Sequence, residues 1–341
     1  PRGRHTGAIR VVCRALAPRS SAMLTVIGLD EAGFGPLLGP LCTGAASISL
    51  DFDPAEGAPN LWAKLSPVVG TSPRACEIPV TDSKKLKSSS KLPLRNLLAG
   101  LVPFVEIAEA TQIRNDEELL RALGVDDLGP FDAEPVSLDL LDGLDQGQRS
   151  LRRAKLTRLS IDNGIQVELV RARAVHPAQL NELFEALGNK SSTNTSLLFG
   201  LLRDVLAMDK HQESPRVVVD RQGGLMRYQP LLISKFHESS INTVAETPEI
   251  SRYRIQRNDK TLHIGFETRA DARHLPVALA SMAAKTVREL LMNRLNSFFE
   301  SKNPGLKPTA GYVQDGRRWV AEIGDLPERL GIPRRYLIRD R

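Results

Sequence analysis

The hydrophobic pattern along the chain predicts strands and helices that alternate. Residues 24–29 and 41–50 combine apolar and small residues on either side of a turn rich in glycine and proline, which indicates two adjacent strands. Apolar residues recur every three or four positions from 276 to 299 and predict a long helix, and Pro276 suits its first turn. The same reasoning gives the other expected elements: strands at 102–108, 165–175, 216–220 and 262–267, and helices at 88–98, 177–187 and 196–208.

Interleaved strands and helices are typical of an α/β fold. The periodicity weakens only between residues 111 and 164, where acids gather from 126 to 145 and bases follow in RSLRRAKLTR. We expect this segment to be an insertion or a subdomain. A chain of 341 residues is long enough for one elaborated domain or for two.

The positive charge is concentrated at the amino-terminal end. The formal charge is +6 and the pI about 9.3, which first suggests an anionic partner such as nucleic acid. Residues 1–22 contain five arginines and no acid, so the rest of the chain carries only about +1. We expect residues 1–22 to be a disordered tail or the product of a misread upstream start, rather than a targeting segment.

The composition is that of a globular protein. Hydrophobic residues make up 41% and charged residues 25%, and no apolar run reaches the roughly 18 residues that suggest a membrane span. The three cysteines, Cys13, Cys42 and Cys76, have no CxxC spacing. These features favour a cytoplasmic protein without a membrane partner.

Acidic residues stand where predicted strands end. Asp30 and Glu31 follow the first strand, Asp220 ends another, and Asp271 precedes the long helix. Ligands bind at strand ends in open α/β sheets, so these acids are candidates for one crevice. Converging carboxylates need a cation, and Mg²⁺ prefers such oxygen ligands. The alternative is that each acid is a turn residue or a helix cap.

Five motifs together resemble the type 2 ribonucleases H, the ribonuclease HII and HIII family. GLDEAGFGPLLGP resembles the family's opening strand, its acid pair and its glycine-rich turn. The other four follow in the family's order: TDSKKL at 81–86, VVVD at 217–220, ADARHLPVALASMAAKTVRE at 270–289 and TAGYVQDGRRW at 309–319. The motifs span most of the chain.

The resemblance implies a ribonuclease H-like fold, with a central mixed β-sheet flanked by helices. Residues 23–341 would form the catalytic domain, with the insertion at 111–164 and a substrate-contacting segment at 305–341. It also implies a monomer that cleaves RNA in RNA/DNA hybrids or ribonucleotide-containing duplex DNA, leaving 3′-hydroxyl and 5′-phosphate ends.

The resemblance further implies a site for two Mg²⁺ or Mn²⁺ ions about 4 Å apart. Asp30 would bridge the two ions, Glu31 and Asp220 would each hold one of them, and Asp271 would complete the site or position the attacking water. These four carboxylates are therefore the expected catalytic and metal-binding residues.

The expected substrate contacts lie in the other motifs. The backbone of Gly33 and Gly35 would approach the ribose, where the 2′-hydroxyl distinguishes RNA from DNA. Ser83, Lys84 and Lys85 belong to the TDSKKL motif, and the lysines are either phosphate contacts or a solvated surface. The remaining two candidates are Lys285, on the polar side of the long helix, and Tyr312, which would meet a sugar or a base.

Phe34 departs from the family's pattern, because ribonuclease HII has arginine in the middle of this Gly-x-Gly loop. A phenyl ring cannot bind phosphate as a guanidinium does. The ring would stack on a base or sugar or pack inward, and we expect it to pack inward.

Two other functions remain open on the same fold. One is a nucleic-acid-binding protein without catalysis, and the other is a structure-selective DNA nuclease. Retention of all four acids argues against the first, because carboxylates weaken binding to a polyanion.

Overall fold

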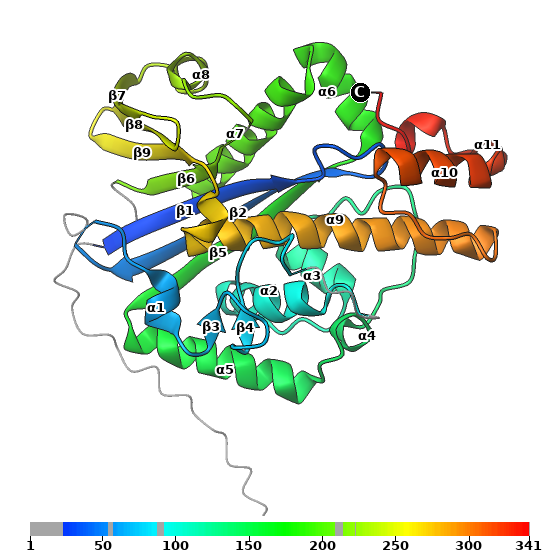
Figure 1. Ribbon diagram of the computed structural model, residues 1–341, viewed down its shortest axis with the longest axis horizontal. Helices are drawn as coiled ribbons and strands as arrows, with labels where there is room; N and C mark the ends of the chain where they lie inside the picture. The colour runs from blue at the N-terminus through cyan, green and yellow to red at the C-terminus, as the bar shows by residue number, and fades with distance from the viewer. Residues whose placement is uncertain (1–22, 54–56, 87–91, 209–213, 222, 341) are drawn as a thin grey trace, which may run out of the picture.

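The computed structural model describes residues 23–53, 57–86, 92–208, 214–221 and 223–340 (Figure 1). Its centre is a seven-stranded mixed sheet in the order β5-β2-β1-β6-β9-β8-β7. β6 pairs parallel with β1 and with β9, and the other neighbours are antiparallel. The strands are β1 (Met23–Ala32), β2 (Leu41–Asp51), β5 (Ile165–Val175), β6 (Arg216–Asp220), β7 (Ser240–Glu246), β8 (Ile250–Arg257) and β9 (Lys260–Glu267), with a separate parallel pair β3 (Val69–Gly70) and β4 (Ile78–Pro79).

Helices cover both faces of the sheet (Figure 1). Alternate residues of β1 face opposite layers, so Val26 packs in the core that contains α9, while Ile27 packs in the core that contains α7. The prediction of a central mixed sheet flanked by helices is confirmed. The helices are α1 (Leu61–Leu65), α2 (Arg95–Ala108), α3 (Asp116–Ala122), α4 (Leu138–Asp142), α5 (Gln146–Asp162), α6 (Pro177–Leu187), α7 (Lys190–Met208), α8 (Gln229–Lys235), α9 (Leu275–Lys302), α10 (Val313–Ile323) and α11 (Leu326–Arg329), with 3-10 turns η2 (Ala270–Ala272) and η3 (Arg334–Tyr336).

The long helix α9 lies directly on the backbones of β1 and β2. A Cβ atom added to Gly28 would lie 2.2 Å from the carbonyl carbon of Pro276, and one added to Gly44 would lie 2.0 Å from the carbonyl oxygen of Ala280. Only glycine permits this approach. The contact brings the first three turns of α9 against the end of β1, where Asp30 stands.

The segment at 111–164 contributes to the main core. Leu119, Leu123 and Leu156 are buried in the same apolar cluster as α2 and α9. The buried guanidinium of Arg149 forms ion pairs with Asp139 at 2.5 Å and with Asp142 at 2.7 Å. The division into a catalytic domain with an insertion stays a prediction.

Several expected elements need correction. Residues 102–108 form the second half of α2 rather than a strand, with Pro103 inside the helix. An apolar run of this length does not distinguish a buried strand from a buried helix. The helix expected at 196–208 begins at Lys190. The pattern analysis missed β7 and β8. Part of the expected helix at 88–98, and the whole of residues 1–22, lie outside the described residues.

The carboxyl-terminal segment packs on the far half of α9 (Figure 1). Trp319 is fully buried and its ring lies 5.0 Å from that of Phe299 in an edge-on arrangement. Leu38, from the loop after β1, joins the same apolar cluster. This packing brings the chain's last residues beside the glycine-rich loop. Within the described ranges, no helix is long and apolar enough to cross a membrane.

Candidate active site

Asp30 and Glu31 were expected to follow the first strand, but they lie within β1, which continues to Ala32, whereas Asp220 is the last residue of β6. β1 and β6 run parallel with Leu29 opposite Val219, so the next residues, Asp30 and Asp220, are neighbours. Asp271 joins them through η2, because the N–H of Ala270 donates to Oδ1 of Asp220 at 2.8 Å. These three acids come from three segments that the sheet brings together.

Asp30 is the most buried of the four acids. Burial and the neighbouring charges of Glu31 and Asp220 raise the pKa of its carboxyl well above the ordinary 3.8. Two hydrogen bonds partly offset this: the Glu31 N–H donates to Oδ1 at 2.8 Å, and the Ser281 hydroxyl of α9 favours the charged form. Burial and like charge both disfavour the ionised form of Asp30, so a cation bound beside it would stabilise that form.

Glu31 faces the other layer of the molecule, toward α7. Burial raises the pKa of its carboxyl, and Asp220 raises it further, while a hydrogen bond from the side chain of Asn194 and the charge of Lys84 lower it. Glu31 therefore interacts electrostatically with Asp220, and the ammonium group of Lys84 lowers the pKa of both carboxyls. The adjacent acids of the sequence therefore approach the site from opposite faces of β1.

Asp220 and Asp271 also titrate above their ordinary range. Burial is the largest cause for both; Asp271 raises the pKa of Asp220, and Asp82 raises the pKa of each. Asp82 is a fifth carboxylate that the sequence reasoning left out, although it lies within the TDSKKL motif. Lys84 lowers the pKa of both acids.

The TDSKKL segment is fixed against α9 at this site. The buried hydroxyls of Ser83 and Ser281 lie 3.1 Å apart. Lys84 and Lys85 are exposed beside the acids, and Lys85 lowers the pKa of Asp271. The structure therefore brings Ser83 and both lysines to the four predicted acids.

The glycine-rich loop continues from Glu31. Gly33 has φ of +89°, and a Cβ there would lie 2.6 Å from Nε of Arg288, so the position requires glycine. A Cβ at Gly35 would meet nothing within 4 Å. Phe34 is 41% exposed, so the expectation that its ring packs inward is wrong. The ring lies on the open side of the loop.

Tyr312 and Lys285 have different surroundings. The carbonyl of Gly311 accepts the N–H groups of Leu37 and Leu38, which places the exposed Tyr312 beside the glycine-rich loop. Lys285 follows Ser281 by one turn of α9, but only 15% of its side chain is exposed and its Nζ lies 2.5 Å from Oε1 of Glu289. Lys285 and Glu289 continue into the exposed Asn293 and Ser297, so Lys285 does lie on the polar side of α9, and its contact with a phosphate stays a prediction.

The donor set suits a hard divalent cation. It consists of carboxylate oxygens, whose pKa values are raised first by burial and then by the neighbouring carboxylates. No group of three or more Asp, Glu, His or Cys side chains in the described ranges is arranged so that it could already hold a metal ion. The residue types and their charge therefore suit a divalent cation, but the side chains would have to move closer together to coordinate one.

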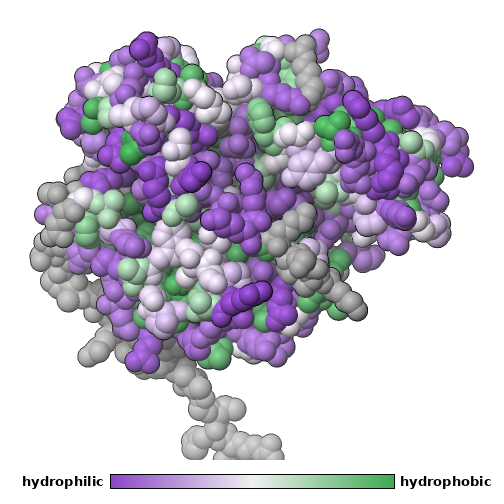
Figure 2. All heavy atoms as spheres, viewed as in Figure 1, coloured by the Kyte–Doolittle hydropathy of each residue, from purple (hydrophilic) through white to green (hydrophobic). Residues whose placement is uncertain are grey.

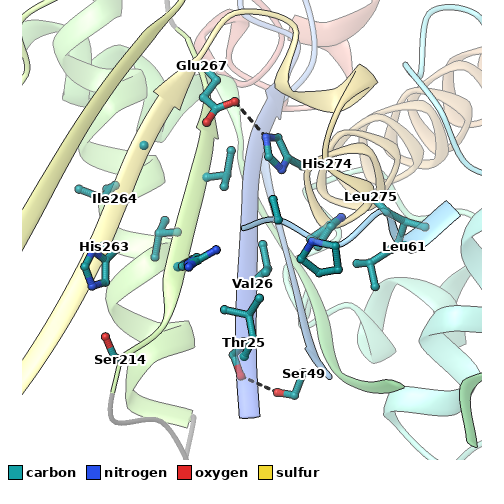
Figure 3. A pocket seen from close by; sticks show the side chains of 18 of the residues that line it. Thr25, Val26, Ser49, Leu61, Ser214, His263, Ile264, Glu267, His274 and Leu275 are labelled. Atoms are coloured by element: carbon teal, nitrogen blue, oxygen red, sulfur yellow. Dashed lines mark hydrogen bonds and ion pairs between the residues drawn. The ribbon is translucent and has the colours of Figure 1, made fainter. Parts of the chain in front are cut away.

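A cavity apart from the four acids is a separate feature of the same molecule. It encloses about 1090 Å³ beside the first turn of α9, against β6, β8 and β9, and none of the four acids lines it. Figure 3 shows His274 pointing to Glu267, where the two side chains are 2.9 Å apart. Arg252 and Arg273 also bind Glu267, each at 3.2 Å. Three basic side chains that line this cavity, those of Arg252, Arg273 and His274, therefore already contact Glu267.

Comparisons with known proteins give only distant structural likeness. No protein-family model and no curated protein matches the chain. Among solved structures it is similar to RNase HII from Archaeoglobus fulgidus in its complex with PCNA, at 17% identity and a TM-score of 0.39, over 93% of this chain and 95% of that one.

Two further solved structures are similar at the same level. For Bst-RNase HIII in complex with Mn²⁺ the identity is 16% and the TM-score 0.40, over 93% of this chain and 66% of that one. For ribonuclease H2 from Pyrococcus horikoshii OT3 the values are 18% and 0.35, over 92% of each chain. These similarities do not identify the role of any residue in this chain.

Proposed function

We propose that this protein is a metal-dependent endoribonuclease of the ribonuclease H type, which cleaves RNA within RNA/DNA hybrids or at ribonucleotides in duplex DNA. The observation that carries the proposal is the cluster of Asp30, Glu31, Asp220 and Asp271 with the lysines of the TDSKKL segment. Buried carboxylates that raise one another's pKa are costly for folding, so their presence together favours a catalytic role.

Asp30, Glu31, Asp220 and Asp271 would hold the metal ions. Two bound Mg²⁺ or Mn²⁺ ions would neutralise the carboxylates and supply Lewis-acid activation of water and of the leaving 3′-oxygen. The chain's own contribution is to fix these oxygens at three strand and turn ends, and to keep Asp30 shielded from solvent between β1 and α9.

Lys84 and Lys85 would bind the phosphates that flank the cleaved bond. Both are exposed, and Lys84 lies close enough to three of the acids to lower their pKa values. A lysine ammonium is a compact charge that suits phosphate without demanding one geometry. Gly33, Phe34 and Gly35, with Tyr312 beside them, would contact the ribose and the neighbouring base.

The cellular setting is part of the same proposal. We propose a monomeric cytoplasmic protein whose partner is the nucleic-acid duplex, with no membrane partner. The two cysteines in the described ranges, Cys42 and Cys76, are both free, which agrees with a reducing compartment.

One assay separates the three candidate functions. Purified protein with Mg²⁺ or Mn²⁺ is incubated with duplexes that contain four ribonucleotides, one ribonucleotide or none. Cleavage at ribonucleotides alone supports the proposal, cleavage of the all-DNA duplex supports a DNA nuclease, and binding without cleavage supports a non-catalytic protein. Asp30→Asn is the control for contaminating nuclease.

A further inference from the structure

The loop from Gly33 to Gly39 is held from inside by two buried arginines. Arg339 donates from Nη1 to the carbonyl of Gly33 at 2.5 Å and from Nε to the carbonyl of Gly39 at 2.8 Å. Arg288 of α9 donates from Nη2 to the carbonyls of Leu38 at 3.2 Å and Ala310 at 3.1 Å. Both arginines are 2% exposed. Three carbonyl oxygens of the loop therefore point inward.

The segment that carries Arg339 is itself fixed. The backbone N–H of Arg339 donates to the carbonyl of Leu37 at 3.0 Å, and Ile338 forms a β-bridge with Leu38. Asn181 of α6 closes the other side, because its amide donates to the Ile338 carbonyl at 3.0 Å and accepts the Asp340 N–H at 2.9 Å. Arg339 thus reaches the loop from a rigid position.

These arginines bind carbonyls rather than acids. In the part of the chain that the structure describes, neither Arg288 nor Arg339 has a carboxylate within ion-pair distance. Burying a guanidinium without an acid costs several kcal/mol, and an apolar side chain would fill the space more cheaply. The contacts that justify Arg339 are the two loop carbonyls, so its effect is to orient them.

The orientation of one carbonyl fixes the neighbouring amide. In a trans peptide the C=O of Gly33 and the N–H of Phe34 point in opposite directions. With the carbonyl directed inward to Arg339, the Phe34 N–H is directed outward, to the side where Phe34 is exposed and Gly35 faces open space. Among the described residues, no protein acceptor takes the N–H of Phe34 or Gly35.

We infer that Arg339 is a positioning residue, which holds the Gly33–Phe34 peptide so that the Phe34 N–H donates to the ribose 2′-oxygen of a bound ribonucleotide. This inference rests on the proposed function. Without Arg339 the peptide is free to rotate and to present the Gly33 carbonyl instead, next to the carboxylates of Asp30 and Glu31. The loop would then lose the donor that distinguishes ribose from deoxyribose.

The test compares binding of two duplexes that differ by one 2′-hydroxyl. Asp30→Asn serves as the parent, so that binding is measured by fluorescence anisotropy without cleavage. Arg339→Gln and Arg339→Lys are made in it, with Arg335→Gln, an exposed arginine of the same segment, as matched control. Thermal melting accompanies each measurement.

We expect the parent and the Arg335 control to prefer the ribonucleotide duplex, and both Arg339 variants to lose about fivefold of that preference while still melting cooperatively. Lysine should fail like glutamine, because a single ammonium cannot hold two carbonyls in a fixed plane. Affinity for the all-DNA duplex should change little.

Other outcomes overturn the inference in distinguishable ways. If the Arg339 variants keep the parent's preference, or if neither variant folds, Arg339 is a structural residue only. If affinity falls equally for both duplexes, the loop contacts a phosphate and not the 2′-oxygen. If the parent itself shows no preference and wild-type protein cleaves neither duplex, the proposed function fails, and this inference with it.

Discussion

The hydroxyl groups of Ser83 and Ser281 lie 3.1 Å apart, although 198 residues separate them along the chain. This contact ties the TDSKKL segment to the second turn of α9. Because Ser281 also lies beside Asp30, it joins the lysines of one motif to the carboxylate of another. Both serines are buried, although hydrophilic residues predominate on the molecular face shown in Figure 2.

Ser281→Ala should move the acid limb of the activity profile to higher pH. The serine hydroxyl favours ionised Asp30, so its removal raises the pKa of that carboxyl. We also expect a loss of about 1 kcal/mol in the free energy of unfolding, from the broken contact with Ser83. Ser301→Ala, near the exposed end of the same helix, is the control, and a profile unchanged from wild type would contradict the coupling to Asp30.

Asp30→Asn should reduce cleavage by at least about a hundredfold, since the metal ions lose a charged oxygen ligand. The same change should raise the Tm of the metal-free protein. A carboxyl whose pKa is higher in the folded than in the unfolded chain binds its proton more tightly when folded, so the free energy of unfolding falls as pH rises above the ordinary 3.8.

Added Mn²⁺ should then raise the Tm of wild-type protein and leave that of Asp30→Asn almost unchanged, because a ligand stabilises only the state that binds it. Calorimetry with and without metal measures both effects. An equal shift in the two proteins would show that the metal binds elsewhere.

Lys84→Gln should weaken binding of every duplex to a similar degree and reduce the slope of log affinity against log salt by about 1. It should also raise the pKa values of Glu31, Asp220 and Asp271, because Lys84 lowers all three. Lys260→Gln, at an exposed hairpin end, is the matched control. If the slope of log affinity against log salt stays at the wild-type value, Lys84 does not contact a phosphate.

Phe34→Arg should change substrate preference without changing stability. The ring is 41% exposed, so the new guanidinium enters solvent and the Tm should stay within about 1 °C of wild type. We expect the ratio of cleavage at a single ribonucleotide to cleavage at a run of four to rise, since arginine adds a possible phosphate contact. Phe34→Ala separates loss of the ring from gain of the charge, and an unaltered ratio in both variants would exclude Phe34 from the substrate site.

Glu267→Gln should destabilise the protein by about 2 kcal/mol, the value of hydrogen bonds to a buried charged group. A hydrogen bond and the charge of His274, together with Arg252 and Arg273, lower the pKa of Glu267 to about 2 against the penalty of burial. For a depressed pKa, the stabilisation is present above the ordinary 4.5 and is lost as pH falls toward 2. Urea unfolding at pH 7 and at pH 3 should therefore show a smaller difference between wild type and variant at pH 3.

The sequence by itself determined the strands that carry the acids. The apolar runs that lead to Asp30 and Asp220 can be recognised in the sequence, because a buried strand needs continuous hydrophobic residues, whereas polar residues are tolerated near its end. The ordered motifs could also be recognised without the fold, because each is a short continuous stretch of the sequence. Residues 102–108 show the limit, because an apolar run alone is compatible with either a buried strand or a buried helix.

Only the tertiary structure decided which groups share the site. Asp82, Ser281 and Asn194 reach the acids through packing between segments that are far apart in sequence, and no periodicity encodes that distance. The burial of Arg339 follows from the pairing of Ile338 and Arg339 with Leu38 and Leu37, a contact between segments about 300 residues apart. A side chain's neighbours, and with them its pKa, its partners and its accessibility, depend on the folded surface around it, which the order of residues specifies only through the complete fold.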